Sequence, residues 1–274
     1  MVLANDNSAF CQSVILDEQC DWEKYEQAYS PEEKLRRIDG IDDELLVYLK
    51  SNQLFESNIC NFHFIDYNLD GNVDIIYSGC AGTDTERTLI FELQDKIFIK
   101  TMDKFGKIIA INTVLGNNLP PLSFTLKQKA CCGGITIVYE VYHSVHMHES
   151  SELQLGFKYS LIEDTFLPST FFEQPKYFEV KNDGYFLRSA PLIDNNSDSN
   201  EFYLNGNIVA QYPIDSKGYA IAQQESDDGR VWWFVVMTNN KGALESIFDT
   251  AGNNENNCIG YVMGWMSSRY LKII

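Results

Sequence analysis

The stretch NFHFIDYNLDGNVDIIYSG, residues 61–79, marks the point at which the chain changes from a helical to a β-strand pattern. A short apolar and aromatic run stands on each side of Asp70-Gly71, a pair that is typical of a turn between antiparallel strands. Similar β-branched and aromatic runs follow as far as residue 162, separated by Gly, Asp and Asn. Because a parallel crossover needs a dozen residues or more, these closely spaced strands predict an antiparallel meander.

The residues before this stretch are expected to be helical. The run SPEE, residues 30–33, is a helix start in which Ser is the N-cap and Pro takes the first helical position. A second amphipathic helix is predicted from the spacing of Ile41, Leu45, Tyr48 and Leu49. The fold class predicted is therefore mainly β with an N-terminal helical segment (α+β).

The chain is expected to contain three parts. Residues 1–58 form a helical segment packed on the next domain, and residues 59–165 form the antiparallel β meander domain. Residues 163–178 contain two prolines and no clear period, which is typical of a linker. A second set of short strands then occupies residues 178–274.

The balance of charge excludes some classes of partner. Against 21 Lys and Arg the chain has 39 Asp and Glu, so its formal net charge is −18. This charge repels a nucleic-acid backbone and an anionic membrane surface. No run of 18 apolar residues occurs, so no membrane span is expected. The first ten residues, MVLANDNSAF, lack the basic and apolar regions of an intact secretory signal.

The seven cysteines contain no C-x-x-C pair, which disfavours a zinc ribbon or a thioredoxin-type site. In an oxidising compartment, Cys11 with Cys20 and Cys60 with Cys80 are plausible disulfides. Buried thiols are the alternative.

One loop has the pattern of a cation site. Oxygen-bearing side chains recur at alternate positions: Asp66, Asn68, Asp70, Asn72 and Asp74. Together with a Gly at the sixth position, they match the front of a calcium loop, in which the seventh residue offers its carbonyl. A helix-loop-helix site would close with Glu where this chain has Tyr77, so Asp74 is expected to close the loop instead. The alternative is a hairpin turn whose Asx residues only cap backbone groups.

The strand-like flanks of this loop resemble the FG-GAP/VCBS-type repeats of β-propellers, where D-x-[ND]-x-D-G-x-x-D joins two strands. The resemblance covers about residues 60–100, with a single copy of the motif. It implies a structural Ca²⁺ in the loop but no complete propeller.

Three pieces of the second half, in this order, resemble the bacterial SH3-like domain: GYFLRSAP (184–191), RVWWFVVM (230–237) and GWMSSRYLKII (264–274). The resemblance covers residues 178–274 and implies a small SH3-like β-barrel with an aromatic ligand groove. The chain departs from the family pattern in the insertion at residues 238–263. That insertion is either a partner-binding loop or a decorated turn that packs on the first domain.

A strand through Trp232 and Trp233 turns the two rings to opposite faces, so one of them is expected near solvent. The resemblance implies a groove formed by Trp232 and Tyr270, to which Trp265 and Arg188 are added as further ligand-binding candidates. Ser267 stands where eukaryotic relatives usually have Pro, which puts the binding of proline-rich peptides in doubt. The alternative is that these aromatic side chains belong to the core.

Catalytic candidates are Cys131 or Cys132 paired with His143, His146 or His148. The run KACCGGITIVYEVY leads directly into a strand, without the helix start that would lower the pKa of the thiol. His146 and His148 fall on one face of a strand and are also metal-ligand candidates.

The sequence thus predicts a non-catalytic binding protein of the bacterial envelope or exterior, periplasmic or secreted, with the cytoplasm left open. Its expected partner is a peptide, peptidoglycan or another protein. The alternatives are a cell-wall hydrolase that uses a Cys nucleophile and an acidic inhibitor or immunity protein that docks on a basic enzyme.

Overall fold

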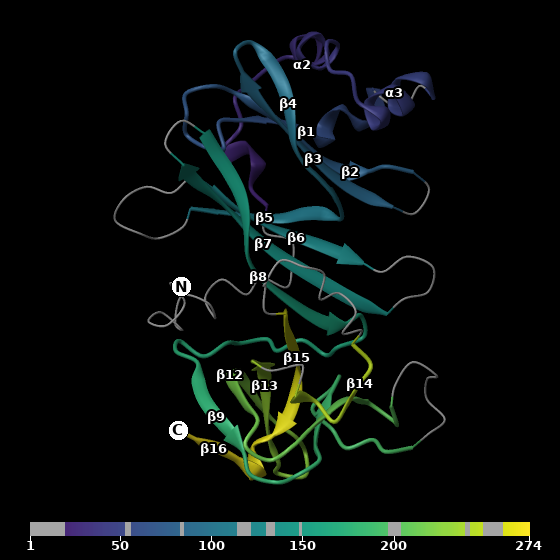
Figure 1. Ribbon diagram of the computed structural model, residues 1–274. Coiled ribbons are helices and arrows are strands. Elements are labelled where there is room, and N and C mark those ends of the chain that lie inside the picture. Colours follow the sequence, from purple (N-terminus) through teal and green to yellow (C-terminus); the bar gives the residue numbers. More distant parts are fainter. Residues whose placement is uncertain are drawn as a thin grey trace. The chain divides into compact units, whose positions relative to one another are not determined.

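The computed structural model describes residues 20–52, 56–82, 85–113, 122–129, 135–147, 150–196, 204–238, 242–248 and 260–274. In this part of the chain the protein is mainly β, with antiparallel sheets and two α-helices, as the sequence predicted. The chain divides into two compact units (Figure 1). The N-terminal unit contains the described residues of Ile15–Cys132 and Tyr139–Gly156, and the C-terminal unit those of Gly133–Val138 and Phe157–Ile274.

The two helices begin where local signals predict them. Helix α2 (Pro31–Ile38) has a capping box, because the Glu33 amide donates to Ser30 Oγ at 3.3 Å and the Ser30 amide to Glu33 Oε2 at 2.9 Å. Helix α3 (Glu44–Ser51) starts at Asp43, whose carboxylate accepts the Leu45 amide. The described helices include none with the length and apolar character that crossing a membrane requires.

The helices cover one face of a four-stranded antiparallel sheet. Its strands, in spatial order, are β1 (Phe62–Ile65), β2 (Asp74–Cys80), β3 (Glu86–Gln94) and β4 (Ile97–Phe105). Alternate residues of these strands, such as Phe64, Ile75 and Leu89, pack against Leu45 and Leu49 of the helical layer. A strand turns successive side chains to opposite faces, so this sheet has a second face to bury.

A second layer of strands covers that face. It consists of β5 (Lys107–Thr113), β6 (Leu122–Lys129) and the parts of β7 (Thr136–Met147) and β8 (Ser150–Ile162) that belong to this unit. Ile76 and Ile90 of the first sheet share a buried core with Ile108 and Phe124 of this layer. The 3₁₀ turn η1 (Trp22–Lys24) borders the same core. The N-terminal unit therefore has three layers: helices, sheet and sheet.

The C-terminal unit is built on a sheet with the order β16-β9-β12-β13-β15-β8. The bounds are β9 (Lys176–Val180), β10 (Tyr185–Arg188), β11 (Ile208–Tyr212), β12 (Lys217–Glu225), β13 (Val231–Met237), β14 (Glu245–Ser246), β15 (Gly260–Ser267) and β16 (Leu271–Ile273). Strand β10 pairs with β11 and β15, and β14 pairs with β11. No closed barrel is formed by the described strands. One reason is that β15 takes β8 as a parallel neighbour, which extends the sheet instead of closing it.

Residues predicted to be a linker and an insertion pack on this unit. In the segment 163–178, the Phe166 amide donates to the Ser189 carbonyl at 2.8 Å and the Phe172 amide to the Ile221 carbonyl at 2.7 Å. In the insertion, β14 pairs with β11 and the side chain of Phe248 is buried in the core. The described part of the insertion therefore packs on its own unit and not on the first domain, and residues 239–241 and 249–259 lie outside the described ranges.

Candidate functional site

The loop between β1 and β2, together with the first residue of β2, contains the five predicted metal-ligand residues. Asp66, directly after β1, turns its carboxylate back into the loop, where it accepts the amides of Asp70 at 3.1 Å and Gly71 at 3.0 Å. Gly71 has a φ of +89°, and Leu69 has a φ of +59°. The tight turn that the motif predicts is therefore present, and its Gly occupies a backbone conformation that favours glycine.

The middle of the loop is held by Asx hydrogen bonds. Asn68 Oδ1 accepts the Asp70 amide at 3.1 Å, and Asp70 Oδ1 accepts the Asn72 amide at 2.7 Å. These bonds aim side-chain oxygens toward the interior of the loop. They are also the bonds that the alternative, a capped hairpin turn, requires, so they do not separate the two interpretations.

Asp74, the first residue of β2, is the buried acid of the motif. Its side chain is 0% exposed, and Oδ1 accepts the Leu93 amide at 3.0 Å. Its other oxygen, Oδ2, is buried and has no hydrogen-bond partner among the residues that the structure describes. Burial raises the pKa of Asp74 to about 7, and the charges of Asp70, Glu92 and Asp66 add to this rise, although the Leu93 amide opposes it. A buried carboxylate oxygen without a partner destabilises the folded state, because that oxygen has lost its hydrogen bonds to water and has no hydrogen bond in their place.

Glu92, on β3, is a buried acid that the sequence analysis missed. It accepts hydrogen bonds from the Tyr67 hydroxyl and from Gln94 Nε2, the latter at 2.9 Å. The pairing of Ile75 with Phe91 brings Glu92 next to Asp74 across the two strands. No local motif marks Glu92, since only the strand register places it beside the loop.

The acids of the loop do not form an all-carboxylate cage. Within the described ranges, no three or more His, Cys, Asp and Glu side chains are grouped so as to hold a metal ion. A hard cation in the loop would need amide and carbonyl oxygens as well, for example from Asn68 and Asn72, and Ca²⁺ accepts such mixed oxygen ligands. The orphaned Asp74 Oδ2 fits such a cation.

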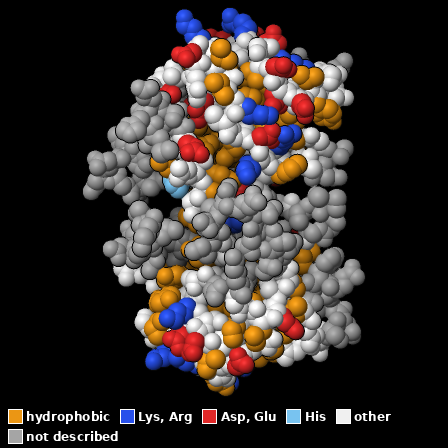
Figure 2. Space-filling model, in the orientation of Figure 1, with side chains coloured by type: hydrophobic (Ala, Val, Ile, Leu, Met, Phe, Trp, Pro, Cys, Tyr) orange, Lys and Arg blue, Asp and Glu red, His pale blue; other side chains and the backbone are white. Residues whose placement is uncertain are grey.

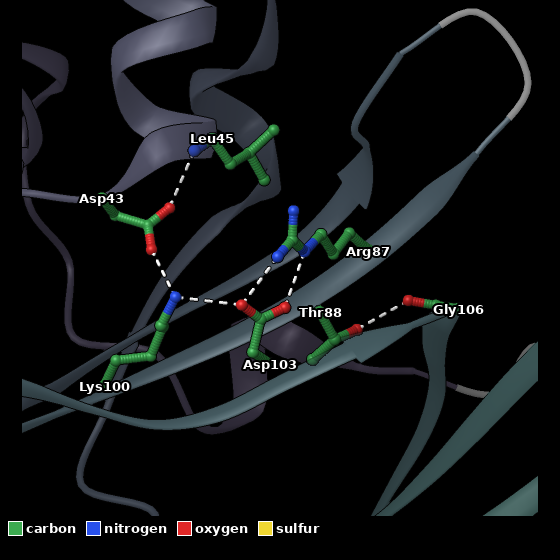
Figure 3. A network of polar contacts seen from close by, with 7 residues as sticks. All are labelled: Asp43, Leu45, Arg87, Thr88, Lys100, Asp103 and Gly106. Atoms are coloured by element: carbon green, nitrogen blue, oxygen red, sulfur yellow. Dashed lines mark hydrogen bonds and ion pairs between the residues drawn. The ribbon is translucent and has the colours of Figure 1, made fainter.

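A second polar network fixes helix α3 to the first sheet (Figure 3). Lys100 Nζ donates to Asp43 at 2.7 Å and to Asp103 at 2.9 Å, and Arg87 forms a two-pronged pair with Asp103 at 2.6 and 2.7 Å. The hydrogen bonds from Arg87 lower the pKa of Asp103, and those to Asp43 and Asp103 raise the pKa of Lys100. The network satisfies its own charges, so its role is to hold the helix cap.

The predicted aromatic groove is wrong in its central residues. The side chain of Trp232 is 2% exposed and that of Trp265 is 0% exposed, and Trp233 is buried as well. The Trp232 indole donates to Ser226 Oγ at 3.2 Å and the Trp265 indole to the Phe166 carbonyl at 2.6 Å. The reason is that both faces of this sheet are covered, and the 163–178 segment lies against Trp265.

Arg188 is also buried, which contradicts its predicted place on a ligand surface. Its guanidinium donates to the Asp194 carbonyl and to the side-chain oxygens of Asn207 and Asn195, so it holds together the chain that follows β10. Tyr270, in the 3₁₀ turn η5 (Ser268–Tyr270), is the predicted groove residue that lies at the surface, with 43% exposure. Its ring makes an edge contact with Tyr185 at 5.8 Å.

The catalytic candidates mostly lie outside the described residues. Cys131, Cys132 and His148 are not among them, nor is the side chain of His146. His143 is half-buried, and burial lowers the pKa of its ring. Of the predicted disulfides, Cys60 and Cys80 are exposed and are not joined to each other, and Cys11 lies outside the described residues.

Comparison with known proteins gives no match: no family model, no curated protein and no solved structure is significantly similar to this chain.

Proposed function

We propose that this protein is a non-catalytic binding protein in which the 66–74 loop holds a structural Ca²⁺. The observation that carries the proposal is the buried Asp74 Oδ2, which finds no partner within the described part of the chain, in a loop that already contains two further carboxylates. A cation would give that oxygen a partner and would offset the repulsion between the acids. Residues Asp66, Asp70 and Asp74 would supply the charge, and Asn68 and the Asn72 carbonyl would complete the oxygen set.

The consequence of binding would be a stiffer loop. Asp66 and Asp74 lie at opposite ends of the turn, after β1 and at the start of β2. A cation held between them would fix the connection of the two strands and lower the cost of burying Asp74. Since the ion binds the folded loop only, it would stabilise the folded state by mass action.

The proposal is tested by calcium titration followed by the melting temperature. We expect the temperature to rise with added calcium in the wild-type protein and to stay unchanged in Asp70→Ala. Asp42→Ala is the matched control, because Asp42 is an exposed aspartate of the same unit, outside the loop, and its loss removes the same charge. No rise at millimolar calcium in the wild-type protein would remove the metal from the proposal.

The finer part of the proposal is recognition at the bacterial envelope or outside it by an SH3-like module. It is supported by the ordered motifs at 184–191, 230–237 and 264–274. With Trp232 and Trp265 buried, a ligand would meet the exposed Tyr270 and its neighbour Tyr185 instead. Binding to purified peptidoglycan tests this part. Tyr270→Ala is expected to weaken the binding without unfolding the protein, and equal binding by this variant and the wild-type protein would contradict it.

A further inference from the structure

Strand β4 lies at one edge of the first sheet and carries exposed apolar side chains. It pairs with β3, and no strand within the described ranges pairs with its other side. It is nine residues long and carries Ile97 and Phe105, which are 67% and 68% exposed. A long exposed edge with unpaired backbone groups is a template for another strand.

A bulge in β4 decides which side chains share a face. Ile90 pairs with Met102 and Phe91 with Lys100, so Thr101 is an extra residue. On the helix side of the sheet lie Phe98, which packs against the helical core, and the charged pair Lys100 and Asp103 (Figure 3).

The same reasoning places the two ends of the strand. Phe105 pairs with Arg87, whose side chain reaches Asp103 on the helix side, so Phe105 belongs to that side as well. Ile97 pairs with Gln94, whose side chain bonds Glu92 on the opposite face. The exposed side chains of Ile97 and Phe105 therefore lie on opposite faces of the sheet.

We propose that β4 is a dimerisation edge on which a second copy of this chain docks its own β4, antiparallel, about a two-fold axis between Thr101 and Met102. In this register Phe98 lies opposite Phe105 of the second copy, and Lys100 lies opposite Asp103 of the second copy. Each pair forms twice. The bulge is what makes the register self-consistent, because it brings side chains of the same face opposite one another.

The charges of the strand fit this partner. The strand and its turn carry Lys96, Lys100 and Lys104 against Asp95 and Asp103, in a chain whose net charge is −18, so the two acidic molecules would meet at a segment that is itself not acidic. In Figure 2, basic and acidic side chains are interspersed over the elements at the top, where Figure 1 places α2, α3 and β4. Opposite charges facing each other across two strands stabilise the pairing, and two facing aromatic rings do the same.

Lysines and a bulge also occur on edge strands that are protected against pairing with another chain. Sedimentation distinguishes such a protected edge from a dimerisation edge. We expect the sedimentation coefficient to rise with protein concentration, and more steeply in high salt, since salt screens the repulsion between two copies of net charge −18. A protein that stays monomeric at every concentration, in low and in high salt, would overturn the proposal.

Phe105→Ser locates the contact. Because the aromatic pair forms twice, its loss is expected to raise the dissociation constant by about tenfold. Phe171→Ser, which removes a Phe of the C-terminal unit that is also exposed, is the control and is expected to leave the constant unchanged. The melting temperature of both variants should stay near that of the wild-type protein.

Hydrogen exchange gives the second readout. In the dimer, amides of β4 are expected to gain protection as the protein concentration rises, while those of β9 do not. A dimer that forms without protection of β4, or that is equally tight in Phe105→Ser, would place the interface elsewhere and refute the proposal. Neither outcome depends on calcium, so the proposal stands or falls separately from the loop.

Discussion

Replacing Asp74 by Asn separates a cation site from a plain turn, because the two interpretations predict different signs. Asn keeps an oxygen for the Leu93 amide and removes the charge from the buried side chain. If the loop is a cation site, the negative charge of Asp74 destabilises the folded protein when the ion is absent, and the carboxylate binds the ion when it is present. Asp74→Asn should therefore stabilise the calcium-free protein and weaken its response to calcium.

The magnitude follows from the pKa of Asp74. The rise from 3.8 to about 7 means that the folded protein holds its proton more tightly than the unfolded chain. Stability from this group is therefore lost as the pH rises through that window and is lowest above it. At about 1.4 kcal/mol per pH unit, the ionised side chain lowers the free energy of unfolding by about 4 kcal/mol, an upper limit because the fold relaxes.

The assay is urea unfolding with chelator and with calcium, each at a pH above 7 and at a pH below 4. With chelator at the higher pH, the variant should be more stable than the wild-type protein by up to about 4 kcal/mol, and the two should converge in acid. With calcium, the wild-type protein should recover much of the difference. A variant that is less stable than the wild-type protein in chelator above pH 7 would refute this reasoning, since it would mean that the Asp74 charge is already well compensated.

Three further predictions concern residues outside the loop. Asp43→Ala should lower the free energy of unfolding by about 2 kcal/mol, because it removes both the cap of α3 and the ion pair with Lys100. Asp43→Asn should lose only about half as much, because its amide oxygen can still accept the Leu45 amide. Equal losses for the two variants in urea unfolding would contradict this separation of cap and ion pair. Burial lowers the pKa of His63, and Lys34 and Lys107 add to this, although the neighbouring Glu26 opposes it. The neutral ring should therefore contribute stability above pH 6.5, and this contribution should decline as the pH falls below that value. Unfolding curves of His63→Gln should lack that decline. Trp232→Ala should cost about 3–5 kcal/mol in denaturant unfolding, as expected for a buried indole, and a neutral result would show that the ring is not packed as described.

The features that local sequence signals determine were predicted correctly. The start of α2 follows from Ser30 and Pro31, which act within one helical turn. The tight turn at Gly71 follows from the spacing of the Asx residues around it. The predominance of antiparallel strands follows from the short intervals between β-branched runs.

The features that depend on distant parts of the chain were not predicted. Asp74 and Glu92 become neighbours through strand register, and Asp43 and Lys100 through the packing of a helix on a sheet. Alternation within β13 correctly separates Trp232 from Trp233 but does not reveal what covers each face. The cover over Trp265 comes from a proline-containing segment that has the composition of a linker.

That cover has a practical consequence for dividing the gene. A fragment starting at residue 178, where the strand pattern resumes, would leave behind Phe166 and Phe172, which cap the indole of Trp265 and border the adjacent core. Such a fragment would expose apolar side chains of the sheet to solvent and would be a poor choice for ligand screening. A fragment that begins upstream of Thr165 retains Phe166 and Phe172 and therefore keeps the sheet covered.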